Sequence, residues 1–134
     1  MKTERYRDLV LTYLDDDTVL VTACDSFGSI GEKECDELKC PAEVVGKVIL
    51  RTPLLEVMCF GAEIVAVTDI ICNEMVTYGE RIIRAIKEEM KGAGLDPEML
   101  NGSTEENFVS RMTGIGAFGA VGASGSKEAT AHSL

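Results

Sequence analysis

The sequence has 134 residues, the length of one domain, and 46% of them are apolar, which is enough to build a hydrophobic core. Its 23 acidic residues outnumber 13 basic ones, and the net charge of −10 argues against nucleic acid as a partner, because phosphate backbones select basic surfaces. No apolar run approaches the ~20 residues that cross a membrane, so a membrane partner is not expected either. The acidity leaves two interpretations open: a solvated surface, or carboxylates that hold divalent cations and, through them, anionic phosphates.

The five cysteines indicate neither a disulfide framework nor a zinc site. They form no C-x-x-C pair, their number is odd, and the only histidine is His132. The N-terminus, MKTERYRD, lacks the apolar segment that a secretion signal needs. We therefore expect free thiols and a cytoplasmic protein.

The first predicted elements form a β-hairpin. Apolar residues alternate with others over 6–14, which is typical of a strand, and a second strand over 18–24 follows the acidic turn at 15–17. Asp8 lies on the first strand, where it is either an exposed acid or a neighbour of Asp25 at the end of the second strand.

The stretch after the second strand is the first candidate for a site. Asp25 ends the strand, and a loop of small residues follows, including Ser26, Gly28 and Ser29. A carboxylate beside exposed backbone N–H groups suits both magnesium and phosphate oxygens, although an ordinary strand-to-loop junction has the same composition. The Gly-Lys-Ser/Thr ending of a Walker motif is absent. The charged segment 26–40 is predicted to be a mobile loop and a candidate lid.

A helix is predicted over 41–60. Pro41 suits its first turn and Gly61 its end. Pro53 is expected to kink or divide the helix and to turn Thr52 toward a site. The predicted apolar face consists of Val44, Val45, Val48, Ile49, Leu55 and Met58.

A buried strand is predicted over 63–72, and Asp69 is the acid inside it. A buried carboxylate costs free energy unless it is paired or bound to metal, so Asp69 is either functional or a hydrogen-bonded structural acid. A second helix is expected to start at a capping box formed by Thr77 and Glu80. Its apolar stripe consists of Ile82, Ile83, Ile86 and Met90.

The last third of the chain combines turn-forming and glycine-rich segments. After an extended segment at 99–100, residues 101–107 (NGSTEEN) have the composition of a turn, and their oxygen atoms also suit magnesium. Residues 112–123 predict a bulged or closely packed strand, because glycines loosen regular pairing. We therefore expect a single domain over 1–123 and a flexible tail over 124–134.

The predicted fold class is α+β, in the order hairpin, helix, strand, helix, glycine-rich strand. This order of motifs resembles the N-terminal, ATP-binding domain of the aminoimidazole ribonucleotide synthetase superfamily, which includes thiamine monophosphate kinase and selenophosphate synthetase. Within that group, the stretches ACDSFGSIG, LRTPLLEVMCFGAE and NGSTEENF are most similar to α-ribazole kinase. The resemblance implies a mixed sheet that pairs with a second subunit to form a barrel, with helices outside and nucleotide sites at the homodimer interface. Most relatives carry a second domain, which this sequence does not show.

The resemblance also implies which residues form the site. Asp25 is expected to act in catalysis and to bind magnesium together with Asp8, Asp69 and Glu106. Glu105 and Asn107 are expected to complete the metal shell or orient the acceptor hydroxyl. The nucleotide is expected to contact Ser26, Gly28, Ser29, Thr52, Gly102, Ser103 and Thr104. The chain departs from relatives in two places, because Arg51-Thr52 stands where Asn-Asp is common and Ser103 replaces an acid.

The resemblance predicts an ATP- and magnesium-dependent small-molecule kinase, with α-ribazole kinase of cobalamin lower-ligand salvage as its first activity. Such a kinase binds a nucleotide and a small nucleoside-like substrate. The alternatives are a thiamine monophosphate kinase-like enzyme and a non-catalytic nucleotide-binding subunit. A structural domain without a ligand is a further alternative, against which the positions of Asp25 and Asp69 argue.

Overall fold

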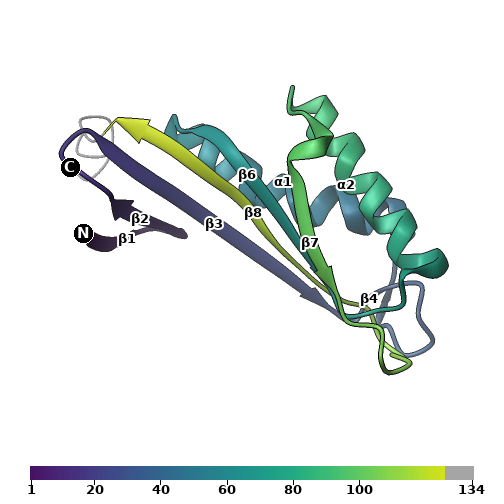
Figure 1. Cartoon of the computed structure of the whole chain (residues 1–134). Helices are drawn as coiled ribbons and strands as arrows, with labels where there is room; N and C mark the ends of the chain where they lie inside the picture. The colour runs from purple at the N-terminus through teal and green to yellow at the C-terminus, as the bar shows by residue number, and fades with distance from the viewer. Residues whose placement is uncertain (126–134) are drawn as a thin grey trace.

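A computed structural model describes residues 1–125, in which six strands form one mixed sheet and two helices pack on it (Figure 1). The strand order is β1-β2-β3-β8-β6-β7, and every pair is antiparallel except β6 with β7. The six strands of this sheet are β1 (Lys2–Tyr6), β2 (Leu9–Tyr13), β3 (Thr18–Gly28), β6 (Glu63–Ile71), β7 (Leu100–Thr104) and β8 (Gly114–Gly125). The remaining elements are the short parallel pair β4 (Ile30–Gly31) and β5 (Leu38–Lys39), with α1 (Ala42–Phe60) and α2 (Glu80–Gly92).

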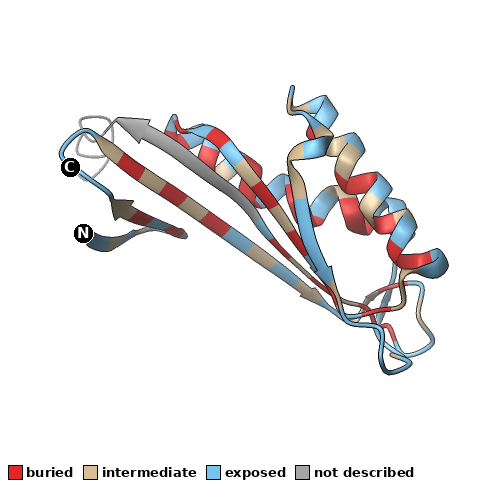
Figure 2. Ribbon diagram, in the orientation of Figure 1, coloured by how far each residue is buried: buried red, intermediate tan, exposed pale blue. Residues whose placement is uncertain are grey.

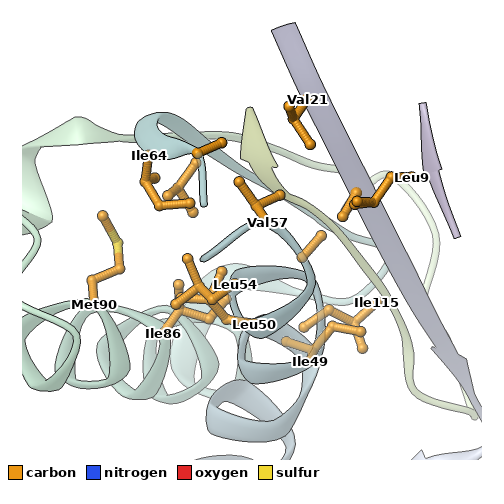
Figure 3. Packing of buried hydrophobic residues seen from close by; sticks show 14 of the residues in the cluster. Leu9, Val21, Ile49, Leu50, Leu54, Val57, Ile64, Ile86, Met90 and Ile115 are labelled. Atoms are coloured by element: carbon orange, nitrogen blue, oxygen red, sulfur yellow. The ribbon is translucent and has the colours of Figure 1, made fainter. Parts of the chain in front are cut away.

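The helices cover one face of the sheet, and the alternation along β3 shows which one. Val19, Val21 and Ala23 are buried, whereas the residues between them are only half-buried, and Figure 2 shows the same alternation. The close-up in Figure 3 shows side chains from the sheet and from both helices meeting in one core. The opposite face carries exposed apolar side chains, among them Val10 and Ile70.

Helix α1 confirms the predicted helix, but one expectation about it is wrong. Pro53 does not divide the helix, which continues from Ala42 to Phe60, so of the two expected effects of Pro53 the kink stays a prediction. Four of the six residues predicted for the apolar face are exposed, namely Val44, Val48, Leu55 and Met58. A neighbouring stripe faces the core instead, because α2 packs directly on Gly46. A Cβ atom added at Gly46 would lie 2.7 Å from the Cβ atom of Ala85.

Helix α2 confirms the predicted stripe, since Ile82, Ile86 and Met90 are buried. The predicted capping box does not form. Residues 75–79 make a π-helical turn that runs directly into the helix, and Gly79 at the N-cap has helical φ and ψ angles. The preceding turn therefore supplies the backbone acceptors that a capping side chain would otherwise provide.

Two segments predicted as loop or turn are strands. Ser26 and Gly28 continue β3 beyond Asp25 and pair with Gly116 and Gly114 of β8. Residues 101–104 pair with β6 in parallel register as part of β7. Their serines, glycines and asparagine favour turns locally, but an adjacent strand outweighs so weak a preference.

The segment after β3 is not an open loop. The carboxylate of Asp36 is buried and accepts hydrogen bonds from the backbone N–H groups of Thr113 and Lys33, at 2.7 and 2.8 Å. Burial alone would raise the pKa of Asp36, but the hydrogen bonds from Thr113 and Lys33 lower it overall. This buried acid ties 29–40 to the start of β8.

The glycine-rich strand confirms the predicted bulges, because the register of β8 shifts against β3 near Ala23 and against β6 near Ala66. All five cysteines are free, as expected. The strand reaches Gly125 at the backbone level, past the predicted domain boundary, and the rest of the predicted tail, 126–134, lies outside the residues that the structure describes. No helix within residues 1–125 has the length and apolar character to cross a membrane.

Candidate functional site

Two of the predicted acids lie in one row across the sheet. Asp25 of β3 and Asp69 of β6 both pair with Ala117 of β8, and Asp69 also pairs with Gly102 of β7. These four positions lie on the helix-covered face of the sheet, because each is in phase with buried residues of its own strand or of the neighbouring strand. With neighbouring strands ~4.8 Å apart, the Cα atoms of the two acids are about 10 Å apart.

Glu56 is an acidic neighbour of Asp8 and Asp25 that was not predicted. Glu56 on α1 has a raised pKa, first because it is buried and then because the charges of Asp8 and Asp25 are close. Its Oε2 atom is buried without a hydrogen-bond partner in the described part of the chain. Glu56 is the only charged residue in the apolar stretch PLLEVMCFGA, and that lone charge is the sequence signal that would have identified it.

The sequence predicted that Asp8 lies on the first strand, and this prediction is wrong. Asp8 belongs to the turn between β1 and β2, where Arg7 adopts a left-handed φ of 54°. Asp8 and Glu56 line a pocket of about 380 Å³. The other lining residues come from this turn, β2 and the end of α1, namely Tyr6, Arg7, Leu9, Leu55, Cys59 and Phe60.

The carboxylates of Asp8, Asp25 and Glu56 fit a divalent cation in their chemistry, although no three His, Cys, Asp or Glu side chains within residues 1–125 converge as a closed metal centre. Magnesium is commonly held by one or two carboxylates together with water and substrate phosphates, so a closed protein cage is not required. The buried oxygen of Glu56 without a partner is an acceptor that such a cation would satisfy. The same cation would relieve the repulsion that raises the pKa of Glu56.

Asp69 lies in a different place, in a second pocket between β7 and α2. Its side chain is 3% exposed, and burial raises its pKa to about 6, which the charge of Lys87 partly opposes. No hydrogen bond reaches this carboxylate from any described residue, so the hydrogen-bonded structural alternative is not what the structure shows. Gly102 makes room for it, because a Cβ atom there would lie 2.5 Å from its oxygens.

The residues predicted to contact the nucleotide are spread over several surfaces. Ser26 and Ser103 are exposed on the open face of the sheet, opposite Asp25 and Asp69 in the alternation. Thr52 is exposed on α1 and lines neither pocket. Ser29 follows β3, with a φ of 63° and its hydroxyl against the sulfur of Met112. Gly28 ends β3, and Gly102 and Thr104 line the second pocket.

The acids and the amide at 105–107 form hydrogen bonds of their own beyond the end of β7. The Glu106 carboxylate accepts a hydrogen bond from the Met75 N–H at 2.9 Å, and Glu105 accepts one from the Asn107 N–H at 2.7 Å. The structure therefore places Glu56 near the charges of Asp8 and Asp25, but it places Asp69 and Glu106 elsewhere. The predicted roles of these residues in metal binding and catalysis stay predictions.

Comparison with known proteins finds solved structures with a similar fold, but no similar sequences. No protein-family model matches the sequence, and no curated protein matches it significantly. Thiamine monophosphate kinase (ThiL) from Aquifex aeolicus superimposes with a TM-score of 0.64 at 14% identity, over 90% of this chain and 38% of ThiL. A ThiL complex with AMPPCP and TMP gives a TM-score of 0.63 at 14% identity, over 88% of this chain and 35% of the other.

A synthase also superimposes on this chain. Phosphoribosylformylglycinamidine synthase II from Thermotoga maritima gives a TM-score of 0.60 at 12% identity, over 90% of this chain and 20% of that one. The T. maritima PurL complex with ATP gives 0.52 at 13% identity, again over 20% of its length. The chain thus spans little more than a third of ThiL and a fifth of PurL. It shares an α+β fold with these parts of the ThiL and PurL chains.

Proposed function

We propose that this protein is an ATP- and magnesium-dependent phosphotransferase that acts on a small molecule. The observation that carries the proposal is the buried Glu56 oxygen without a partner, next to the charges of Asp8 and Asp25. The fold supports it, because the solved ThiL and PurL structures that share the fold include complexes with AMPPCP and with ATP.

The three carboxylates suit phosphoryl transfer because this reaction depends mainly on charge neutralisation and positioning. Asp8, Asp25 and Glu56 would hold magnesium, which when bound supplies positive charge to the nucleotide phosphates. A carboxylate of the same group can accept the proton of the acceptor hydroxyl, since a loose transition state needs only a weak base. Glu105 and Asn107 remain proposed as residues that orient the acceptor, from the exposed segment after β7.

A thiamine monophosphate kinase-like activity is the better supported choice of acceptor, because ThiL shares the fold over 90% of this chain. The α-ribazole kinase activity rests on three short sequence stretches, and the structural comparisons add no support for it. A nucleotide-binding subunit without catalytic activity is the outcome expected if the protein binds ATP and gives no product with either acceptor.

We also propose that two copies pair through the open face of the sheet, as the resemblance implies. This face carries Val10, Ile70 and Phe118, which are 36%, 38% and 47% exposed. Apolar side chains gathered on one face are typical of a surface that another protein covers. Exposed Ser26 and Ser103 lie on the same face.

The test is to incubate the protein with ATP, magnesium and either thiamine monophosphate or α-ribazole, and to detect products by mass spectrometry. Glu56→Gln and Asp25→Asn remove one negative charge each with little change of shape. We expect each variant to lose about 10²-fold or more of turnover, the scale of a lost electrostatic contact to the transition state.

Glu63→Gln is the matched control, because Glu63 is exposed at the start of β6 and lines neither pocket. We expect it to retain wild-type turnover. Unchanged turnover in both Glu56→Gln and Asp25→Asn would contradict the proposed magnesium site. If no turnover is found, calorimetric titration with ATP and magnesium distinguishes a subunit that binds the nucleotide from a protein that does not bind it.

A further inference from the structure

The pocket between β7 and α2 is independent of the proposed magnesium site. It has a volume of about 210 Å³ and lies across β8 from Asp25. We call it the Asp69 pocket. Its lining residues are Asp69, Met75, Ile83, Lys87, Leu100, Asn101, Gly102 and Thr104.

The Asp69 carboxylate is the feature of this pocket that points to a ligand. It is nine-tenths or more buried, lines the pocket and receives no hydrogen bond from the described residues. A buried carboxylate without a donor costs free energy, so a donor that enters the pocket gains what the protein leaves unsatisfied. The missing side chain of Gly102 keeps the carboxylate accessible, because any Cβ atom there would fill the space beside it.

The walls and the rim restrict what such a donor can be. An apolar cavity of about 150 Å³ holds one benzene molecule, so a pocket of this size accommodates a single ring with a small substituent. Ile83 and Leu100 supply apolar walls, and the two oxygens of Asp69 suit a planar group with two N–H donors. Lys87 adds a positive charge, which disfavours a bare metal cation and favours a ligand with an anionic group at its other end.

We propose that the Asp69 pocket binds a small ring that presents an amidine-type N–H edge to Asp69 and an anionic group to Lys87. This inference goes beyond phosphotransfer and does not depend on it, because the site uses none of Asp8, Asp25 and Glu56. The ligand class is a monocyclic compound with both a cationic amidine or aminoheterocycle and an acid.

The test uses three probes of matched size, with binding followed by amide chemical shifts and by calorimetry on the full chain without nucleotide. 4-Amidinobenzoate carries both groups, benzamidine lacks the anion, and benzoate lacks the N–H donors. We expect affinity to fall in that order, with shifts at Asp69, Lys87 and Gly102. Absence of saturable 4-amidinobenzoate binding, or shifts confined to other parts of the chain, would overturn the proposal.

Variants test the two charged contacts separately. Asp69→Asn keeps the shape and is expected to weaken 4-amidinobenzoate by about tenfold or more, whereas Glu63→Gln on the same strand leaves it unchanged. Lys87→Met is expected to bring 4-amidinobenzoate down to the affinity of benzamidine. Gly102→Ala fills the space beside Asp69 and provides a second test should Asp69→Asn fold poorly. Equal binding by the wild type and by the pocket variants that fold would refute the assignment.

Discussion

At the scale of single residues, Asp69 shows how burial without a partner changes a carboxylate. Burial raises its pKa to about 6, whereas in an unfolded chain a carboxyl group of this kind titrates near pH 3.9. The folded state therefore holds the proton more tightly than the unfolded state. The contribution of Asp69 to the free energy of unfolding is therefore greatest below about pH 4, and it is lost as the pH rises to about 6.

Asp69→Asn is expected to remove this dependence on pH. At pH 7 the variant is expected to be more stable than the wild type, by at most about 3 kcal/mol, because no charge is then buried. Below about pH 4 the two proteins are expected to be equally stable. Urea unfolding at pH 7 and at the lowest pH that keeps the fold measures the difference. A variant less stable than the wild type at pH 7 would show that the ionised carboxylate is satisfied in the folded protein.

At the scale of elements, the contact between α1 and α2 determines which side of α1 is buried. Two neighbouring stripes of α1 are apolar, one through Val44 and Val48 and the other through Val45 and Ile49. Only the second is buried, because α2 approaches at Gly46. The apolar residues of the other stripe remain exposed.

Glycine-to-alanine substitutions in the two helices test this contact. Gly46→Ala is expected to destabilise the protein by about 1–3 kcal/mol, although alanine favours helix, because the new methyl group meets α2. Gly92→Ala is the matched control, because nothing lies within 4 Å of the added Cβ atom, and it is expected to be neutral or stabilising by up to ~1 kcal/mol. Thermal and urea unfolding compare the two. A stabilised Gly46→Ala would contradict close helix packing.

At the scale of the whole molecule, the sheet has one covered and one open face. The helices lie over one face of the sheet (Figures 1 and 2). That face carries Asp25 and Asp69, and the opposite face leaves Ile70 and Phe118 exposed. The proposed dimer would cover this open face.

Ile70→Lys is expected to convert the proposed dimer to a monomer, because a lysine there would be buried without a partner in the interface. Val48→Lys on the outer side of α1 is the control, since Val48 is similarly exposed, at 37% against 38%, but lies on a helix. Sedimentation equilibrium measures the mass of each protein. A wild-type chain that is monomeric at all concentrations, or an Ile70→Lys variant that stays dimeric, would rule out this interface.

The sequence by itself determined the local features of this protein. The strand over 18–24, the extent of α1, the buried stripe of α2, the buried position of Asp69 and the free cysteines all follow from residue periodicity and composition. The candidate acids Asp8, Asp25 and Asp69 were recognisable for the same reason, as charges beside or within apolar strands.

Only the tertiary structure decided what lies next to what. It continued β3 through Ser26 to Gly28, placed Glu56 beside Asp8 and Asp25, and moved Asp69 into a pocket of its own. Periodicity gives the faces of an element but not its neighbour, and both the weak strand preference of a Ser/Gly segment and the grouping of distant carboxylates depend on that neighbour.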